Sequence, residues 1–353
     1  MTATTRLEPT NARQRANDRA IGYWLLVCAA MVLAMIVIGG ITRLTESGLS
    51  IVYWRPVTGF LPPLGAAAWT EAFELYRTSP QYLVVNAGMT LAEFRTIFWW
   101  EYIHRAWGRL IGLVFFVPFA WFLVRGRVRS NLVLRLVGLF VLGGAQGVLG
   151  WYMVQSGLVD VPEVSQYRLA AHLSLAFLIY AALIWTGLSL ALPVTAVAAD
   201  RIAPRVRRIA VAVLVLVSLT VLSGAFVAGI DAGLIYNTFP LMDGGFLPPS
   251  YFATAAAAFE DHGTVQFHHR ALAIASLIGV TALWWQSRWL ALTPRARRVA
   301  DGLLAMAGLQ VALGITTLLL VVPVHAAATH QAGAALLFTL ALWLLHELRA
   351  TAA

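Results

Sequence analysis

Lysine is absent from this 353-residue chain, cysteine occurs once, and charged residues of both signs make up only 12% of it. The single cysteine, Cys28, excludes an intramolecular disulfide and any cysteine-based zinc or iron–sulfur site. The scarcity of charged residues leaves too few to cover an ordinary soluble surface. In addition, 60% of the residues are hydrophobic, which is more than a soluble domain uses. The chain is therefore expected to be a polytopic membrane protein.

The N-terminal stretch lacks the apolar core and small-residue cleavage site of a signal peptide, and Glu8 and Asp18 argue against a transit peptide. Residues 1–20 are therefore expected to form a disordered cytoplasmic tail. The net charge of +9 comes from arginines that fall in short clusters between apolar runs. Membrane topology explains such clusters, so no nucleic-acid partner is expected.

Eight apolar stretches approach or exceed the roughly 20 residues that a membrane-spanning helix needs. They are expected at residues 21–41, 102–124, 132–154, 168–192, 207–229, 267–289, 299–321 and 325–345. Arginine clusters precede the first span and mark the junctions of spans two and three, four and five, and six and seven. All four clusters then lie on one side, which the positive-inside rule makes cytoplasmic. Both termini are predicted to be cytoplasmic, and the segments 42–101 and 230–266 to lie outside.

The two halves of the chain repeat each other. "EYIHRAWGRLIGL" aligns with "QFHHRALAIASLI", "GGAQGVLG" with "AGLQVALG", and "RLAAHLSLAFLIY" with "AAATHQAGAALLF". An even number of spans in each copy gives both copies the same orientation. We therefore predict an all-α fold of two tandem four-helix bundles, residues 21–192 and 207–345, joined by a linker at 193–206 and followed by a cytoplasmic tail at 346–353.

The repeat sorts the eight histidines. His104 aligns with His269, and His172 with His330, each within the outer end of a span. Ionisable residues inside a membrane are functional-site candidates. Two helices of one bundle that each bring a histidine to a similar depth suit bis-imidazole ligation of a haem iron, whereas zinc needs three or four ligands. Structural roles are expected for the remaining histidines: His262, His268, His325 and His346.

Other polar residues accompany these histidines. Arg105 and Arg270 each follow one of them, where a guanidinium can pair with a haem propionate or extend to the membrane surface. Weaker candidates for the same role are Arg109 and Arg168. Gln146 and Gln310 can donate to a cofactor or to a neighbouring helix, and the sequence leaves both readings open. The glycines four residues later, Gly150 and Gly314, are expected to permit close helix packing.

The halves differ in front of their first histidine. Glu101 lies three residues before His104, whereas Gln266 lies three before His269, and this spacing puts both side chains on one helix face. A carboxylate beside a reacting iron can accept a proton or orient water, and its alternatives are a salt bridge to Arg105 or a helix cap. The first outer segment is also longer, and its stretch 79–100 is expected to lie along the membrane as an amphipathic helix.

The chain resembles the haem A synthase family from about residue 21 to 345. The resemblance rests on "GGITRLTESGLSI", "EYIHRAWGRLIG", "GWYMVQSGL" with "RLAAHLSLAF", "NTFPLMDGGFLPP", "QFHHRALA" and "THQAGA". It implies a membrane oxidoreductase that converts the C8 methyl group of haem O to a formyl group, giving haem A for terminal oxidases. It further implies haem O as substrate between His104 and His172, haem b between His269 and His330, and Glu101 as the catalytic residue.

Some members of that family carry a cysteine pair in the first outer loop, assigned to a disulfide, which this chain lacks. It is similar to the members without the pair. The resemblance implies a bacterial inner membrane, with the haem sites toward the outer, periplasmic side. Pathway logic adds the farnesyltransferase haem O synthase and an unidentified electron-transfer partner, and a homo-oligomer is left open.

Two other functions are consistent with such a chain. One is a non-catalytic di-haem b electron carrier, and the other is a transporter built from repeats, which would bind no haem. Almost no ionisable residues lie at the midplane of the spans, where transporter sites usually are, so the transporter ranks last.

Overall fold

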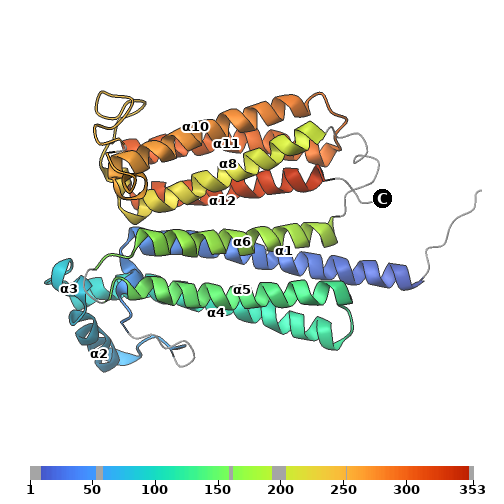
Figure 1. The fold of residues 1–353 in the computed structure, drawn as a ribbon. Helices are drawn as coiled ribbons and strands as arrows, with labels where there is room; N and C mark the ends of the chain where they lie inside the picture. The colour runs from blue at the N-terminus through green and yellow to red at the C-terminus, as the bar shows by residue number, and fades with distance from the viewer. Residues whose placement is uncertain (1–8, 53–58, 159–161, 193–203, 252, 350–353) are drawn as a thin grey trace, which may run out of the picture.

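The structure, a computed structural model, describes residues 9–52, 59–158, 162–192, 204–251 and 253–349 (Figure 1). Within these residues the regular structure is helical, and a single β-bridge joins Met242 to Gly245. The long helices are α1 (Pro9–Leu44), α4 (Leu91–Val124), α5 (Ser130–Gln155), α6 (Gln166–Ala191), α8 (Pro204–Gly229), α10 (His262–Ser287), α11 (Pro294–Leu319) and α12 (Val324–Glu347). The all-helical class predicted from the sequence is thereby confirmed.

Short helices fill the segments between the long helices that the sequence predicts to lie outside, and we call these the outer segments. They are η1 (Ser47–Leu49), α2 (Gly65–Arg77), α3 (Pro80–Val84), η2 (Ala232–Leu234) and α9 (Ala257–Glu260). Since η1 follows α1 and η2 follows α8, the repeat seen in the sequence extends to these turns. Their preceding residues, Glu46 and Asp231, share the left-handed backbone conformation, with φ of 52° and 53°.

Each predicted span coincides with one long helix. For most of these helices, both ends agree with the predicted ends to within a few residues. In the described part of the chain, seven of these helices are long and apolar enough to cross a membrane. The remaining helix, α10, is equally long but carries His268, His269 and Arg270 near its outer end and Trp284 and Trp285 near its inner end, which lowers its hydropathy.

The long helices pack in two groups that lie side by side (Figure 1). In the first group α1 contacts α4 and α6, and α5 contacts the same two helices. In the second, α8 contacts α10 and α12, and α11 likewise contacts both. The groups meet through α1 with α12 and through α6 with α8 and α12. Phe177 and Phe338 pack edge to face in this interface, and Tyr180 is hydrogen-bonded to Thr339.

The predicted tail boundaries need correction. Residues 9–20 are helical and continue α1, because Asp18 is buried, accepts a hydrogen bond from Gln14 and pairs with Arg129 of the α4–α5 connection. Residues 1–8, 350–353 and 193–203 of the predicted tails and linker lie outside the described residues. At the other end, His346 and Glu347 belong to α12 and are buried, so they are not part of a tail.

The predicted amphipathic surface helix is also wrong over residues 91–100. These residues form the outer end of α4, which starts at a capping box in which Thr90 and Glu93 each accept a hydrogen bond from the other's backbone N–H. This extension packs on α2 through an aromatic cluster of Trp69, Tyr76, Phe94 and Phe98. The cluster holds the first outer segment against α4, next to Glu101.

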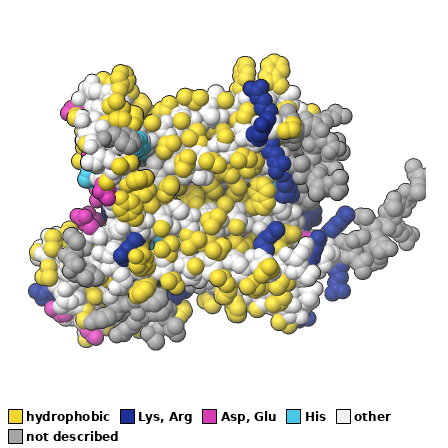
Figure 2. Space-filling view, in the orientation of Figure 1, with side chains coloured by type: hydrophobic (Ala, Val, Ile, Leu, Met, Phe, Trp, Pro, Cys, Tyr) yellow, Lys and Arg dark blue, Asp and Glu magenta, His cyan; other side chains and the backbone are white. Residues whose placement is uncertain are grey.

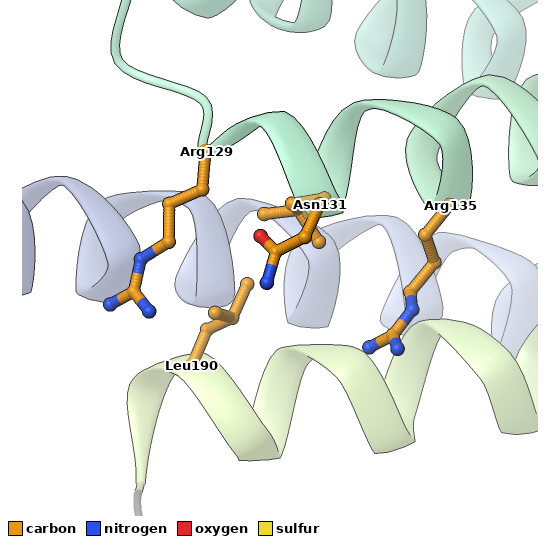
Figure 3. A pocket seen from close by; sticks show the side chains of 5 residues that line it. Arg129, Asn131, Arg135 and Leu190 are labelled. Atoms are coloured by element: carbon orange, nitrogen blue, oxygen red, sulfur yellow. The ribbon is translucent and has the colours of Figure 1, made fainter.

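The surface fits a membrane environment. Figure 2 shows hydrophobic side chains spread over the middle of one face, with most acidic side chains toward one end and most basic ones toward the other. Large apolar side chains that are more than half exposed include Val117, Leu134, Val148 and Ile278. Soluble monomers rarely expose continuous apolar surface of this kind. A shallow pocket at the basic end is lined by Arg129, Asn131, Leu132, Arg135 and Leu190 (Figure 3).

Candidate haem sites

Each of the four repeat-matched histidines rests against a glycine of a neighbouring helix. The pairs are His104 with Gly39, His172 with Gly150, His269 with Gly224, and His330 with Gly314. A Cβ atom would lie 2.9 Å from the nearest ring atom at Gly150 and Gly314, closer than side chains tolerate, and 3.1 to 3.2 Å at Gly224 and Gly39, which is tighter than most Cβ contacts. Glycine therefore makes room for an imidazole at all four places. The expectation that Gly150 and Gly314 serve helix packing is too general, since they face the rings.

Two of the rings have a glutamine beside them. Gln310 Nε2 donates to the backbone carbonyl of His330 at 2.9 Å and lies 3.0 Å from its ring Nδ1. In the other half, Gln146 Nε2 donates to the carbonyl of His172 at 3.0 Å and lies 3.4 Å from a ring nitrogen. The two glutamines thus have one role in both halves: each ties α5 or α11 to the histidine of the next helix.

His269 has a different neighbour. The Ser223 hydroxyl on α8 lies 2.8 Å from Nδ1 of His269, and it also donates to the carbonyl of Thr220 at 2.8 Å. A metal-binding histidine usually engages its second ring nitrogen in a hydrogen bond of this kind. With Nδ1 engaged, Nε2 of His269 is the nitrogen that remains to bind a metal.

The second-half pair has a spacing that fits a shared metal ion. The ring centroids of His269 and His330 are 6.4 Å apart. An imidazole nitrogen lies about 1 Å from its ring centroid and binds a metal at about 2 Å, so two rings that share one metal have centroids about 6 Å apart. Among the described residues, no three histidine, cysteine, aspartate or glutamate side chains gather to hold a metal, so the available donors are imidazole pairs.

Buried polar atoms without a partner mark the same places. Within the described residues they include Gln146 Oε1, Gln310 Oε1 and His172 Nδ1. Such atoms are rare in folded proteins, because leaving one unpaired costs on the order of 1–3 kcal/mol. Their position beside the paired histidines is consistent with sites that a bound group completes. The donor set, the glycine contacts and these atoms together fit haem iron.

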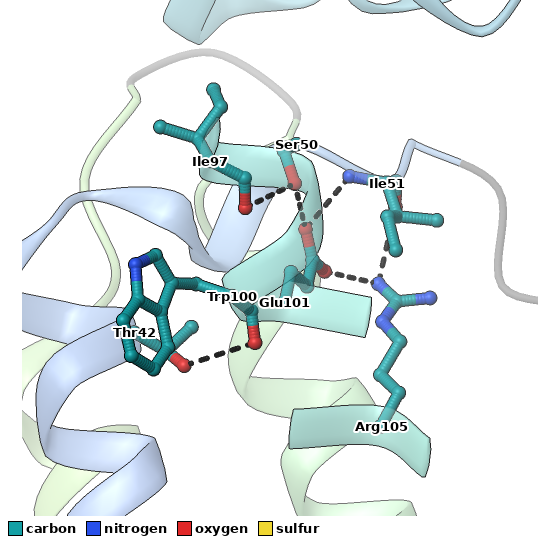
Figure 4. Close-up of polar contacts among 7 residues, drawn as sticks. All are labelled: Thr42, Ser50, Ile51, Ile97, Trp100, Glu101 and Arg105. Atoms are coloured by element: carbon teal, nitrogen blue, oxygen red, sulfur yellow. Dashed lines mark hydrogen bonds and ion pairs between the residues drawn. The ribbon is translucent and has the colours of Figure 1, made fainter. Parts of the chain in front are cut away.

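Glu101 is buried at the outer end of α4, and both of its carboxylate oxygens accept hydrogen bonds (Figure 4). Its Oε2 accepts hydrogen bonds from the Ser50 hydroxyl and the Ile51 backbone N–H, both at 2.7 Å. Its Oε1 accepts from Arg105 at 2.5 Å. The salt bridge anticipated as the alternative role of Glu101 therefore exists, and the carboxylate fastens residues 50–51 to α4.

The second half uses an amide in the same place. Gln266 is buried, its Oε1 accepts from Arg270 at 2.9 Å, and its Nε2 donates to the carbonyl of Ala232 at 2.8 Å. Both halves thus pin the turn after their first helix to the helix that bears the histidine. The first half does so with a carboxylate, which can only accept hydrogen bonds and receives one from the Ser50 hydroxyl. In the second half, the repeat places Ile235 at the position of Ser50.

Arg105 and Arg270 hold the outer segments. Arg105 donates to the Ile51 carbonyl at 3.1 Å, and Arg270 donates to the matching Tyr236 carbonyl at 2.6 Å and to that of Thr238 at 2.9 Å. The weaker candidates lie on aromatic rings. The Arg109 guanidinium lies over Phe60, and that of Arg168 over Tyr152, whose carbonyl it also binds.

The remaining histidines have other surroundings. His262 is the first residue of α10 and is exposed, His268 packs against Tyr251, and the carbonyl of His325 accepts from Thr329. His346 is buried at the inner end of α12, where its Nε2 lies 3.2 Å from the Ser189 hydroxyl of α6.

Sequence reasoning missed several residues that the structure brings into the sites. They are Ser50, Ser223, Gly39 and Gly224. The repeat alignment carried a signal for the glycines, since Gly39 and Gly224 occupy matching positions. The serines gave no such signal, because each occurs in one half only.

The chain is similar to known proteins along nearly its whole length. The family of cytochrome oxidase assembly proteins, COX15-CtaA, matches residues 22–342. "Heme A synthase" of Nitrosospira multiformis is 52% identical over 349 residues, covering 98% of both chains. That of Parvibaculum lavamentivorans is 54% identical over 94% of this chain and 95% of its own, and human "Heme A synthase COX15" is 46% identical over 95% and 84%. The chain belongs to the COX15-CtaA family of cytochrome oxidase assembly proteins.

Proposed function

We propose that this chain is a haem A synthase, an oxidoreductase that converts the C8 methyl group of haem O to a formyl group. Relatives of that name are about half identical to it along nearly their whole length. The structural observation that carries the proposal is the set of four histidine–glycine contacts, two in each half. The first half has the salt bridge between Glu101 and Arg105 beside its site, and the second half has the amide of Gln266 in the matching place.

The second half is the proposed haem b site, with His269 and His330 as iron ligands. In its support, the two rings have the separation that a shared metal requires, and the Ser223 hydroxyl lies at Nδ1 of His269. When bound, haem b would supply electron transfer. The residues around it hold and orient the rings: Gly224 and Gly314 admit them, while Ser223 and Gln310 fix their direction.

The first half is the proposed substrate site, with His104 and His172 as ligands of haem O. Glu101 lies one turn before His104 on the same face of α4, so its carboxylate is available to take up a proton or place a water during oxidation. The bonds from Ser50, Ile51 and Arg105 hold that carboxylate in one position.

Arg105 and Arg270 are proposed to bind haem propionates while they hold the outer segments. A guanidinium has five N–H donors, so it can serve a backbone carbonyl and a propionate together. Since both arginines bind matching carbonyls, Ile51 and Tyr236, the two sites would be closed in the same manner.

We propose that α10 is the eighth membrane span and that the two groups of helices are two tandem four-helix bundles, residues 21–192 and 207–345. The arginine clusters support a cytoplasmic location of both termini and an outer location of the haem sites. In a bacterium this is the inner membrane. Haem O synthase and an electron-transfer protein are the proposed partners.

The main alternative is a di-haem electron carrier, which the near-symmetry of the four histidine contacts would also suit. Co-expression with haem O synthase in a host that makes no haem A separates the two. A haem A synthase leads to haem A in extracts of the membranes. Accumulation of haem O alone, with the protein folded and haem-loaded, would favour the carrier.

A further inference from the structure

The contacts of the Ser223 hydroxyl suit one tautomer of His269. The hydroxyl has a single hydrogen, and the Thr220 carbonyl, which can only accept, lies 2.8 Å from it. When that hydrogen goes to the carbonyl, the hydroxyl oxygen is the acceptor toward His269 and Nδ1 carries the ring proton. This tautomer leaves the lone pair of Nε2 free, which is the form that binds a metal.

The first half lacks this device. Ser223 directly precedes Gly224, which faces the ring of His269, and Ile38 directly precedes Gly39, which faces the ring of His104. The two positions correspond in the repeat, and an isoleucine side chain neither donates nor accepts a hydrogen bond. The tautomer and direction of the His104 ring are thus not set from this position of α1.

The other ligand of each pair has a glutamine beside it in both halves. At the other ligand, Gln146 and Gln310 bind the carbonyls of His172 and His330 in the same way, at 3.0 and 2.9 Å. A glycine faces each ring in both halves, although Gly39 is nearest to Nε2 of His104 and Gly224 to Cε1 of His269. The glutamines meet different ring nitrogens, since Gln310 Nε2 lies 3.0 Å from Nδ1 of His330 and Gln146 Nε2 lies 3.4 Å from Nε2 of His172. At the first ligand of each pair, the halves differ in the contact between Ser223 and His269.

We propose that Ser223 is a positioning residue that makes the second-half site retain its haem, and that Ile38 in its place leaves the first-half site able to exchange. The inference rests on the proposed function, in which one haem is a resident cofactor and the other a substrate that leaves after oxidation. A hydrogen bond from Nδ1–H to an oxygen orients the ring and increases the basicity of Nε2, and loss of such a partner typically weakens metal binding by about 10–100-fold.

The test compares Ser223→Ala, Ser223→Thr and Ser218→Ala in the full-length, haem-loaded protein. Ser218 is on the same helix and its hydroxyl donates to the Leu214 carbonyl, which makes it a matched control. The measurements are the rate at which haem b transfers to apomyoglobin and the reduction potential of the haem that remains. We expect Ser223→Ala to lose haem b about 10–100-fold faster with a more positive potential, and Ser223→Thr and Ser218→Ala to behave like the unchanged protein.

The reciprocal variant, Ile38→Ser, adds the hydroxyl to the first half. It is expected to slow the transfer of haem O to apomyoglobin while leaving haem b unaffected. Equal haem b loss and equal potential in Ser223→Ala and the unchanged protein would overturn the inference, as would the same change in Ser218→Ala. Failure of the proposed function looks different, because a di-haem carrier would hold haem b in both halves and the unchanged protein, co-expressed with haem O synthase, would yield neither haem O nor haem A.

Discussion

The imidazole of His330 lies directly against Gly314, so closely that a Cβ on this glycine would be 2.9 Å from the ring Cε1. His172 has the same 2.9 Å relationship to Gly150 in the other half. A contact repeated at this closeness after duplication indicates that the space beside the ring is part of the site. Substitution of such a glycine therefore tests the site without changing a proposed iron ligand.

Gly314→Ala is expected to push the His330 ring out of its position and remove most of the bound haem b. Ring displacement misaligns the donor nitrogen, and ligand geometry must hold to about half an ångström. The measurement is the haem b content per protein after purification. Gly308→Ala is the matched control, because a Cβ at Gly308 on the same helix meets no other atom within 4 Å. Equal haem content in both variants would contradict the assigned role of Gly314.

Glu101→Gln is expected to abolish haem A formation while the protein stays folded. The variant keeps the shape of the side chain, but one of its two polar atoms becomes a donor, which conflicts with the donors Ser50, Ile51 and Arg105. Part of any effect therefore comes from loosening residues 50–51, at a cost of about 1–3 kcal/mol.

Ser50→Ala separates the two contributions, because it removes one anchor of this segment and leaves the carboxylate. We expect it to retain most haem A formation, with faster proteolysis of the first outer segment. If Ser50→Ala were as inactive as Glu101→Gln, the carboxylate would act as an anchor and its catalytic assignment would fail. Gln266→Glu tests the matching place in the second half and is expected to create no second reacting site.

Gly22→Ala is expected to destabilise the protein, because its Cβ would lie 2.6 Å from the backbone nitrogen of Ala191 and 2.9 Å from the carbonyl oxygen of Gly187. Backbone atoms of α6 cannot turn aside, so α1 and α6 must separate, at a cost of about 1–3 kcal/mol. Thermal unfolding in detergent measures the effect. Gly112→Ala on α4 meets nothing within 4 Å and is expected to be neutral or to raise the melting temperature, because alanine favours helix. A similar loss in both variants would contradict the close α1–α6 packing.

Acid is expected to loosen the outer end of α10. Burial raises the pKa of Asp261, but hydrogen bonds from Thr264 and Ser250 outweigh it and hold the pKa below its ordinary value of 3.8. Because the folded-state pKa is the lower one, the helix cap stabilises fully above about pH 4 and is lost as the pH falls through the folded-state pKa. Hydrogen exchange of the Thr264 amide, corrected for its intrinsic pH dependence, should rise below that pH.

Asp261→Asn provides the control for this effect. Asparagine also caps helices through its side-chain oxygen but does not titrate, so its Thr264 amide should show no such rise. An equal rise in the asparagine variant would locate the acid-sensitive group elsewhere.

The sequence predicted the helices well for a physical reason. A membrane span needs about 20 apolar residues in a row, and the repeat supplied a second copy against which each span could be checked. The outer end of α4 escaped this reasoning, because residues 91–100 are only partly apolar and are held by aromatic packing on α2, which involves Trp69 and Phe94. Asp18 likewise keeps the start of α1 helical through a contact with Arg129 that no local pattern reveals.

At the candidate sites, the sequence identified the histidines that are proposed to bind haem and left out the residues that contact them. The four histidines stood out because ionisable residues are rare in apolar helices and these recur in register. Ser223 and Gly39 are ordinary residues in an apolar run until the neighbouring helix is known. The bond between Ser50 and Glu101 joins residues far apart in the chain, so only the folded structure brings it to light.

The haem content of ligand variants tests the central claim most directly, namely that one half of the chain holds a cofactor and the other a substrate. The protein is purified after co-expression with haem O synthase, and its haems are extracted and separated for the unchanged chain, His330→Ala and His172→Ala. The account predicts haem b together with haem O or haem A in the unchanged protein, loss of haem b alone in His330→Ala, and loss of haem O and haem A alone in His172→Ala. Haem b in both halves, or loss of the same haem from both variants, would contradict it.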